Sequence, residues 1–188
     1  MSDHIDRDGF RANVGIVLMR EGGCVFLGQR IGGKGWQFPQ GGVHLGETLE
    51  QAMLRELGEE IGLGPADVEV LGVTTDWLRY RLPARFVRRD QSPVCIGQKQ
   101  RWYLLRSRLP DPPFRFDSTG EPEFVGWRWA DYWDPVREVI HFKRQVYERA
   151  LHDLGRTALP GGLPPYPAWW ADRAPKRLPK PSPDKPAG

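Results

Sequence analysis

The chain lacks any apolar stretch long enough to cross a bilayer, and it has little cysteine. No run in its 188 residues approaches 18 consecutive apolar residues, which excludes a helical membrane protein. Its first ten residues are polar and do not resemble a signal peptide. Cys24 and Cys95 lie far apart in strand-like segments, so we expect reduced core side chains rather than a disulfide or a metal pair. These features predict a cytoplasmic protein with no membrane partner.

The chain also has no excess charge outside its C-terminal end. Lys and Arg exceed Asp and Glu by three, and this whole excess lies in residues 160–188. A positive surface elsewhere must therefore come from local clustering. Residues 160–188 also hold 9 of the 18 prolines, which favour extended backbone. We predict a folded domain over residues 1–158 and a flexible, basic tail over 159–188, although its aromatic residues Tyr166, Trp169 and Trp170 leave docking open.

Apolar patterns along residues 1–158 predict both strands and helices. Pro135 opens a last helical region, whose apolar stripe from Phe142 to Leu154 is expected to end at Gly155. A chain of this length forms one domain with a buried core. We predict an α/β (α+β) fold in which helices sandwich a mixed sheet. The strand-like segments are 14–19, 24–29, 68–74, 94–105 and 124–129.

The most informative stretch runs from Gly41 to Leu63 and combines four glutamates with an arginine and two glycines. Its spacing is GX5EX7REUXEEXGU, where U is aliphatic, and every specified position is met. A chain of this length meets such a pattern by chance with a probability on the order of one in ten million. The specified positions are Gly41, Glu47, Arg55, Glu56, Leu57, Glu59, Glu60, Gly62 and Leu63.

Local signals place the glutamates of this stretch on a helix over residues 49–61. A capping box of Thr48 and Gln51 begins the helix, and Gly62 is its expected C-terminal stop. At about 100° per residue, Glu56, Glu59 and Glu60 are neighbours beside the apolar face, with Glu60 closest to it. A hard divalent cation such as Mg²⁺ would offset their repulsion. The alternative is a solvated acidic face on which Arg55 is an ordinary ion-pair partner.

The signature resembles that of the Nudix hydrolases, which cleave nucleoside-diphosphate-linked substrates with divalent metal. Over about residues 8–154 the chain also resembles the bacterial RNA pyrophosphohydrolase subfamily, whose members are also described as dinucleoside polyphosphate hydrolases. Ala12 and Gly58 depart from the usual subfamily residues, but neither lies at a signature position. The matching words are NVGIVL (13–18), GWQFPQGGV (35–43), EQAMLRELGEEIGL (50–63), WLRYRLP (77–83), PVCIGQKQRWYLL (93–105), EFVGWRW (123–129) and DPVREVIHFKRQVY (134–147).

The resemblance implies a Nudix fold and a metal-assisted attack of water on the 5′ polyphosphate of RNA. The cofactor would be Mg²⁺ or another divalent cation such as Mn²⁺, and the 5′-monophosphate product would promote mRNA decay. Glu56, with Arg55, would be catalytic and would orient or deprotonate the water. Glu47 would pair with Arg55 to support the loop, and Gly62 would be structural. The implied metal ligands are Glu56, Glu59, Glu60, Glu123 and a main-chain carbonyl at Gly41.

Candidate substrate contacts are basic, aromatic and amide side chains in the matching words. Lys143 beside Phe142 offers a cation for phosphate and a ring for stacking a base, although Phe142 also fits the apolar stripe of its helix. Lys99 and Arg101 are further basic candidates. The principal candidates are Arg11, Arg30, Tyr80, Gln98, Phe142 and Lys143.

Three functions are compatible with this chemistry. The first is RNA 5′-pyrophosphohydrolase, and the second is a hydrolase of dinucleoside polyphosphates such as diadenosine tetraphosphate. The third is a non-catalytic nucleotide- or RNA-binding module, which predicts the loss of a signature carboxylate, and none is lost. We expect RNA 5′ ends and nucleoside polyphosphates as partners, and a monomeric protein.

Overall fold

Eight strands and three α-helices form the described part of the chain, which in the computed structural model comprises residues 5–33, 35–90, 92–117 and 120–173. The strands are β1 (Phe10–Met19), β2 (Val25–Arg30), β3 (Trp36–Gln37), β4 (Gln40–Gly42), β5 (Val68–Val73), β6 (Leu78–Arg81), β7 (Gly97–Ser107) and β8 (Phe124–Ala130). The helices are α1 (Leu49–Ile61), α2 (Asp134–Glu138) and α3 (Arg144–Ala158), with short 3-10 turns η1 (Ile31–Gly33), η2 (Pro65–Asp67), η3 (Ala84–Phe86), η4 (His141–Lys143) and η5 (Ala168–Arg173).

Strand β1 lies at the centre of a mixed sheet. It pairs in parallel with β7 along its whole length, from Phe10 opposite Gly97 to Met19 opposite Arg106. All the other strand pairs among the described residues are antiparallel, including β1 with β2 and β4, and β7 with β5 and β6. The expected mixed sheet is therefore confirmed. Strand β4, which leads into the signature helix, pairs with the central strand β1.

Helix α1 has the bounds that the local signals predict. The Thr48 hydroxyl accepts a hydrogen bond from the Gln51 amide, and the Gln51 side chain accepts one from the Thr48 amide. These two bonds satisfy amides that the first helical turn leaves without partners. At the other end Gly62 adopts φ 74°, a left-handed conformation that glycine reaches at little cost. The two caps fix which turn of α1 carries each signature glutamate.

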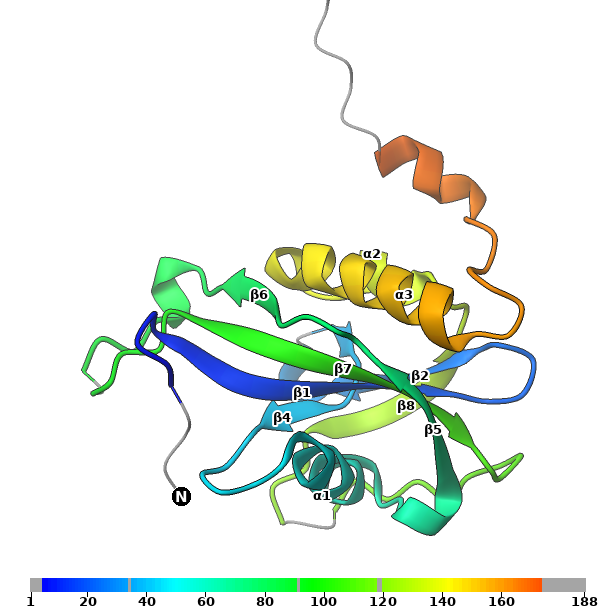
Figure 1. Ribbon diagram of the computed structural model, residues 1–188, viewed down its shortest axis with the longest axis horizontal. Coiled ribbons are helices and arrows are strands. Elements are labelled where there is room, and N and C mark those ends of the chain that lie inside the picture. Colours follow the sequence, from blue (N-terminus) through cyan, green and yellow to red (C-terminus); the bar gives the residue numbers. More distant parts are fainter. Residues whose placement is uncertain (1–4, 34, 91, 118–119, 174–188) are drawn as a thin grey trace, which may run out of the picture.

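Helices cover both faces of the sheet (Figure 1), which confirms the predicted sandwich. Alternate β1 residues pack in opposite directions because side chains alternate along a strand. Val17 and Met19 join the cluster under α3, which includes Tyr147 and Leu151. Ile16 and Leu18 instead join the cluster over α1. Helix α1 is thereby held against the sheet through its apolar side, and its acidic residues lie along the edge of that contact.

The end of α3 and the burial of the cysteines differ from the sequence-based predictions. Helix α3 does not end at Gly155 but continues to Ala158. A Cβ on Gly155 would come within 2.6 Å of Leu163 Cδ1 and 3.0 Å of Tyr132 Oη, so this glycine permits close packing instead of ending the helix. Cys24 and Cys95 are free, as predicted, but each is half-buried rather than part of the core.

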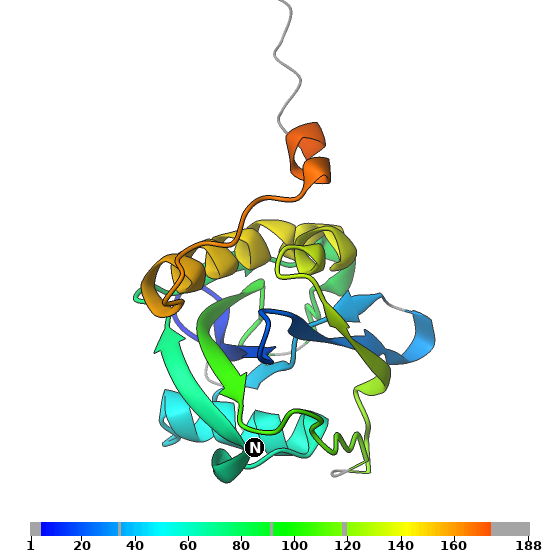
Figure 2. The ribbon, with the colours of Figure 1, turned by 90° about the vertical axis from the view of Figure 1, so that its right-hand side faces the viewer.

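Part of the predicted tail packs on the body of the protein. The indole N–H of Trp133 donates to the Pro164 carbonyl oxygen at 3.1 Å. The Trp133 ring lies 5.1 Å from Tyr166 and 4.8 Å from Trp170, measured between centroids. Figure 2 shows this segment leaving the end of α3 and passing over α2 and α3 before η5. Residues 159–173 therefore form an aromatic strap on the face of α2 and α3, while residues 174–188 of the predicted tail lie outside the described part.

None of the helices in the described residues combines the length and the apolar character needed to span a membrane.

Candidate active site

A cleft of about 670 Å³ opens between α1, strand β4 and the ends of β1, β2 and β7. Nine of the residues proposed from the sequence contribute to its wall, although they come from positions 11 to 143 of the chain. The lining residues are Arg11, Asn13, Arg30, Gln37, Gln40, Gly41, Gly42, Glu56, Glu59, Glu60, Gln98, Glu121, Glu123 and Lys143. The cleft thus combines carboxylates, cations and amides.

Helix α1 presents three carboxylates to this cleft, and Glu60 is the most buried of them, as predicted. Glu60 is 6% exposed and Glu56 is 8% exposed, whereas the Glu59 side chain is 42% exposed. Burial raises the pKa of Glu60 well above its usual value of 4.5, and the neighbouring Glu56 carboxylate raises it further. Burial also raises the pKa of Glu56, and the Arg55 guanidinium partly opposes that rise. The two buried carboxyls therefore bind protons or cations more readily than solvated ones.

Arg55 connects the loop before α1 to the acidic face. Its Nε and Nη2 donate to the two carboxylate oxygens of Glu47 at 2.8 and 3.0 Å, and Nη2 also donates to the Gly42 carbonyl at 2.7 Å. Its Nη1 donates to Glu56 at 2.7 Å and to Glu59 at 3.0 Å. The predicted Glu47–Arg55 pair is present, and the Arg55 hydrogen bond holds the pKa of Glu47 below its usual value. One guanidinium thus sets the position of three signature carboxylates.

Gly41 lies directly against the carboxylate of Glu56. A Cβ built on Gly41 would be 1.9 Å from Glu56 Oε1 and 2.1 Å from Oε2. Only a residue without a side chain permits this approach. Strand β4 holds Gly41 in place by pairing it with Val14 of β1. The first glycine of the signature is therefore required by the position of the buried glutamate.

Three cations face the carboxylates across the cleft. Arg30 Nη2 lies 3.2 Å from Glu123 Oε2, and the Arg11 guanidinium lies against the main chain at Gly42. Lys143 is buried, with Nζ 3.4 Å from Gln37 Oε1. Burial lowers the pKa of Lys143 from 10.5 to about 8. These cations are positioned to neutralise an anion that enters between them and the acidic face.

The remaining substrate candidates Tyr80, Gln98 and Phe142 contact one another. The Tyr80 hydroxyl donates to Gln98, which lines the cleft, and the Tyr80 ring is buried. Phe142 does not line the cleft but packs on Tyr80, with centroids 5.9 Å apart. Lys99 also lies outside the cleft, where it is ion-paired with Asp6 at 2.8 Å. Arg101 is likewise not among the lining residues.

Sequence reasoning missed several polar residues of the cleft. The Asn13 Oδ1 and Gln40 Oε1 atoms are buried there and have no hydrogen-bond partner among the described residues. Asn and Gln are common on protein surfaces, so their presence in the sequence does not by itself indicate a binding site. Asn13 and Gln40 do lie within two of the matching words. The missed residues are Asn13, Gln37, Gln40, Gly42 and Glu121.

Comparison with known families identifies the family of this chain. The model of the NUDIX domain matches residues 9–153, which contain the complete signature and every candidate site residue. The chain belongs to the NUDIX family. The family assignment agrees with the geometry of the cleft, because the signature loop and α1 supply its acidic wall.

Related proteins extend the comparison in sequence and in structure. The NUDIX chain is 56% identical over 163 residues to the RNA pyrophosphohydrolase of Alkalilimnicola ehrlichii, covering 87% of this chain and 90% of the relative. It is 59% identical over 151 residues to the RNA pyrophosphohydrolase of Psychrobacter cryohalolentis, covering 80% and 87%. The dihydroneopterin triphosphate pyrophosphohydrolase of E. coli shares its fold, with a TM-score of 0.58, 20% identity, and coverage of 74% and 94%. A C. elegans Ap4A hydrolase complex gives a TM-score of 0.54 at 17% identity, covering 73% and 93%.

NUDIX hydrolases generally use divalent cations, and the donor set of the cleft fits such an ion. Carboxylate oxygens are the preferred ligands of hard divalent cations, and buried carboxyls with raised pKa values gain most from a nearby positive charge. Within the described residues no three His, Cys or acidic side chains form a ready-made cage.

Replacing Glu60 by glutamine is expected to stabilise the metal-free protein at pH 7. Because burial raises the pKa of Glu60 above 4.5, the folded state binds this proton more tightly than the unfolded state, and stability falls as pH rises through the folded pKa. Glutamine removes that cost, which we expect to be about 1–3 kcal/mol. Thermal unfolding in EDTA measures the effect.

The same comparison at pH 4 is its internal control. There the wild-type carboxyl is already protonated, so the difference between Glu60→Gln and wild type is expected to disappear. A variant that is less stable than wild type at pH 7 without metal would contradict the assignment of Glu60 as a strained, buried carboxylate.

Proposed function

We propose that this protein is an RNA pyrophosphohydrolase that removes pyrophosphate, or phosphate from a diphosphate end, from the 5′ end of RNA. The main support is the identity of 55–59% to relatives of that name over most of the chain, together with an intact signature. An activity on transcripts would take place in the cytoplasm, and its 5′-monophosphate product would favour mRNA decay.

The cations and carboxylates of the cleft suit opposite parts of this reaction. The 5′ polyphosphate would lie between Arg11, Arg30 and Lys143, which neutralise its negative charge. Phosphoryl transfer depends mainly on such positioning and charge stabilisation. Glu123, which the resemblance assigns to the metal site, is paired with Arg30 at 3.2 Å. The pair brings a predicted metal ligand next to a predicted phosphate ligand.

Glu56 is the proposed acceptor of the proton from the attacking water. The water oxygen forms a bond to phosphorus, the anhydride P–O bond breaks, and pyrophosphate leaves from the 5′-monophosphate RNA. The raised pKa of Glu56 suits a general base, because a base transfers protons most efficiently when its own pKa lies near the operating pH. Arg55 holds this carboxylate through Nη1 at 2.7 Å. A divalent cation held by Glu56, Glu59, Glu60 and Glu123, with the Gly41 carbonyl, would supply electrostatic stabilisation and a more acidic water. We propose Mg²⁺ for this role.

Competition between two substrates tests the proposal. Purified protein with Mg²⁺ is incubated with 5′-triphosphorylated RNA or with diadenosine tetraphosphate, and kcat/KM is compared. We expect a clear preference for RNA. A preference for the dinucleotide would contradict the proposal and favour a dinucleoside polyphosphate hydrolase. Absence of both activities would favour a non-catalytic binding module.

Deletion of residues 159–188 is expected to separate stability from catalysis. The strap packs on Trp133, away from the cleft residues, so hydrolysis of diadenosine tetraphosphate should keep its kcat/KM. Loss of the aromatic contacts should cost on the order of 2 kcal/mol, or roughly 5 °C in Tm. Melting curves and initial rates provide the two measurements. A large loss of activity at a temperature where the variant is folded would show that the segment belongs to the active domain.

A further inference from the structure

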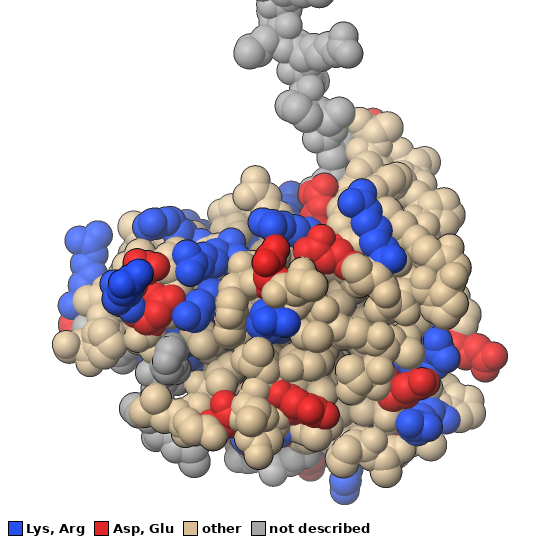
Figure 3. Space-filling model, viewed as in Figure 1, with Lys and Arg blue, Asp and Glu red and all other residues tan. Residues whose placement is uncertain are grey.

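Positive charge is concentrated on one segment outside the active-site cleft. Five arginines, all exposed, fall within eleven residues, and the acidic residue that follows them is Asp90. Outside residues 160–188 the chain has equal numbers of basic and acidic residues, so this cluster is a local excess. Figure 3 shows several Lys and Arg side chains, with some Asp and Glu side chains among them, at the end of the molecule where Figure 1 places β6. The arginine segment comprises Arg79, Arg81, Arg85, Arg88 and Arg89.

The charge of this segment is not cancelled by carboxylates. In the described ranges none of the five guanidinium groups forms an ion pair with an acidic side chain. Arg79 and Arg81 instead lie over the ring of Phe10, at 5.2 and 5.7 Å from its centroid. Arg85 lies over the exposed ring of Phe86 at 5.0 Å. Such cation–π contacts orient a guanidinium and leave its charge available to a polyanion.

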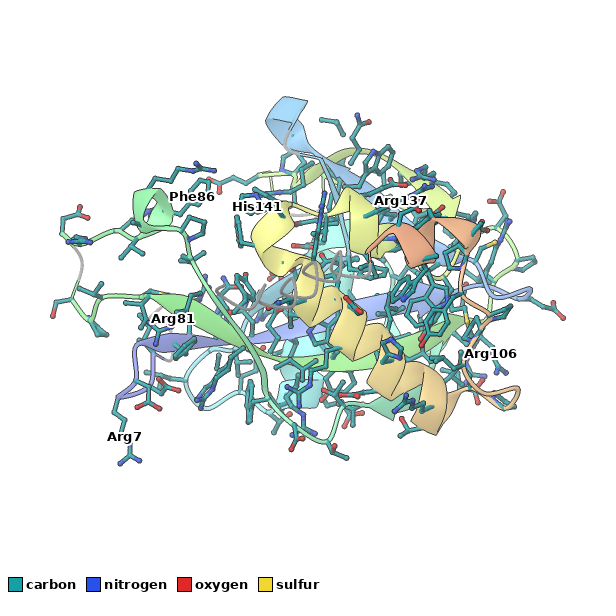
Figure 4. The ribbon with its side chains drawn as sticks, turned by 90° about the horizontal axis from the view of Figure 1, so that it is seen from above. Arg7, Arg81, Phe86, Arg106, Arg137 and His141 are labelled. Atoms are coloured by element: carbon teal, nitrogen blue, oxygen red, sulfur yellow. The ribbon has the colours of Figure 1, made fainter. Side chains whose placement is uncertain are left out.

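A row of rings connects the arginine segment to the cleft. The Tyr80 hydroxyl bonds to Gln98 in the cleft wall. The row continues outward from Tyr80 to Phe142, with ring centroids 5.9 Å apart, and from Phe142 to Phe86, with centroids 5.7 Å apart. Figure 4 places Phe86 on η3 beside the segment that carries His141, at the same end of the molecule as Arg81. A groove of about 280 Å³ crosses β6 here, lined by Phe10, Arg79, Tyr80, Arg81, Phe142 and Gln145.

We infer that the arginine segment and Phe86 bind the RNA chain downstream of the 5′ end held in the cleft, an inference that rests on the proposed function. Single-stranded RNA presents a regular series of phosphates and unpaired bases, and proteins bind it with cationic grooves and stacking rings. The arginines supply the first element, and Phe86, a residue that is 44% exposed, supplies the second. A dinucleoside polyphosphate has no continuing chain of phosphodiester groups to place along this surface. The segment therefore distinguishes RNA from dinucleoside polyphosphates.

The test compares substrates of different length in matched variants. Arg85→Gln, Arg88→Gln and Arg89→Gln are combined in one protein, and the control combines Arg115→Gln, Arg149→Gln and Arg156→Gln, which remove three exposed arginines elsewhere. Substrates are a 5′-triphosphorylated 20-nucleotide RNA, a 5′-triphosphorylated dinucleotide and diadenosine tetraphosphate. The kcat/KM of each is measured at several salt concentrations.

We expect the arginine-segment variant to lose about tenfold in kcat/KM on the 20-nucleotide RNA alone. The slope of log kcat/KM against log salt should fall by about 2, because each phosphate contact on a single strand contributes about 0.7. The control variant should retain wild-type values. An unchanged kcat/KM on the long RNA, or an equal loss in the control variant, would overturn the inference and leave an acidic protein or an anionic surface as the partner of the arginine segment. Failure of wild-type protein to hydrolyse any triphosphorylated RNA would instead refute the proposed function.

Discussion

Glu56→Gln is expected to lower kcat/KM on 5′-triphosphorylated RNA by about 10³-fold while the protein stays folded. Glutamine keeps the volume of the side chain but cannot accept the proton of the attacking water, and it is a poorer ligand for a divalent cation. The change also leaves Arg55 Nη1, which donates to Glu56 at 2.7 Å, with a neutral acceptor. Initial rates measure the loss, and circular dichroism with thermal unfolding checks the fold.

The matched control for this variant is Glu50→Gln. Glu50 lies on the first turn of α1, is exposed and is not among the residues that line the cleft. The Glu50→Gln variant loses the same charge from the same helix, so its kcat/KM should stay within about twofold of wild type. Near-normal turnover of Glu56→Gln would show that another group accepts the proton, and the role proposed for Glu56 would then be wrong.

Gly41→Ala is expected to reduce kcat/KM by at least about 10²-fold. The added methyl would lie 1.9 Å from the Glu56 carboxylate, so either the carboxylate or strand β4 has to move. A displacement of about 1 Å at reacting groups can cost 10²-fold in rate. Because Gly41 is also the proposed carbonyl ligand, the Mg²⁺ concentration for half-maximal activity should rise. Metal titrations of the initial rate measure both effects.

Gly58→Ala provides the control for adding a methyl group within the signature region. A Cβ on Gly58 meets the Leu63 carbonyl oxygen at 3.7 Å, an ordinary contact. Alanine in the interior of α1 should raise stability by up to about 1 kcal/mol and leave kcat/KM unchanged. If Gly41→Ala also kept full activity and the wild-type metal requirement, the close approach of Gly41 to Glu56 would have no catalytic importance.

The helix that carries the signature glutamates was predictable because its determinants are local. Thr48, Gln51 and Gly62 fix the ends of α1 through contacts within the segment itself. The order of burial of Glu56, Glu59 and Glu60 follows from helical periodicity, since the same rotation that buries Ile61 brings Glu60 to the apolar edge. The spacing of these glutamates along one helix is therefore enough to predict that they share one wall of the cleft.

Features that depend on distant contacts were not predictable in the same way. Gly155 carries a common signal for a helix end, but its neighbours Leu163 and Tyr132 make it a packing residue. Strand β6 was not predicted, because its four residues alternate apolar and charged types over too short a length to give a clear period. Asn13 and Gln40 reach the cleft only because β1 and β4 pair with each other. The catalytic roles of the cleft residues remain predictions.

The parallel pairing of β1 with β7 also constrains the order of folding. Every residue of β1 has its β7 partner at position 97 or beyond, past the midpoint of the 188 residues. During synthesis β1 can pair with β2 and β4 early, but it has to wait for more than half of the chain before its longest strand contact can form. Contacts between segments so far apart in sequence slow folding. Until β7 arrives, the strand beneath the active site has an unpaired edge, and nascent chains that stall before residue 97 are expected to be prone to aggregation.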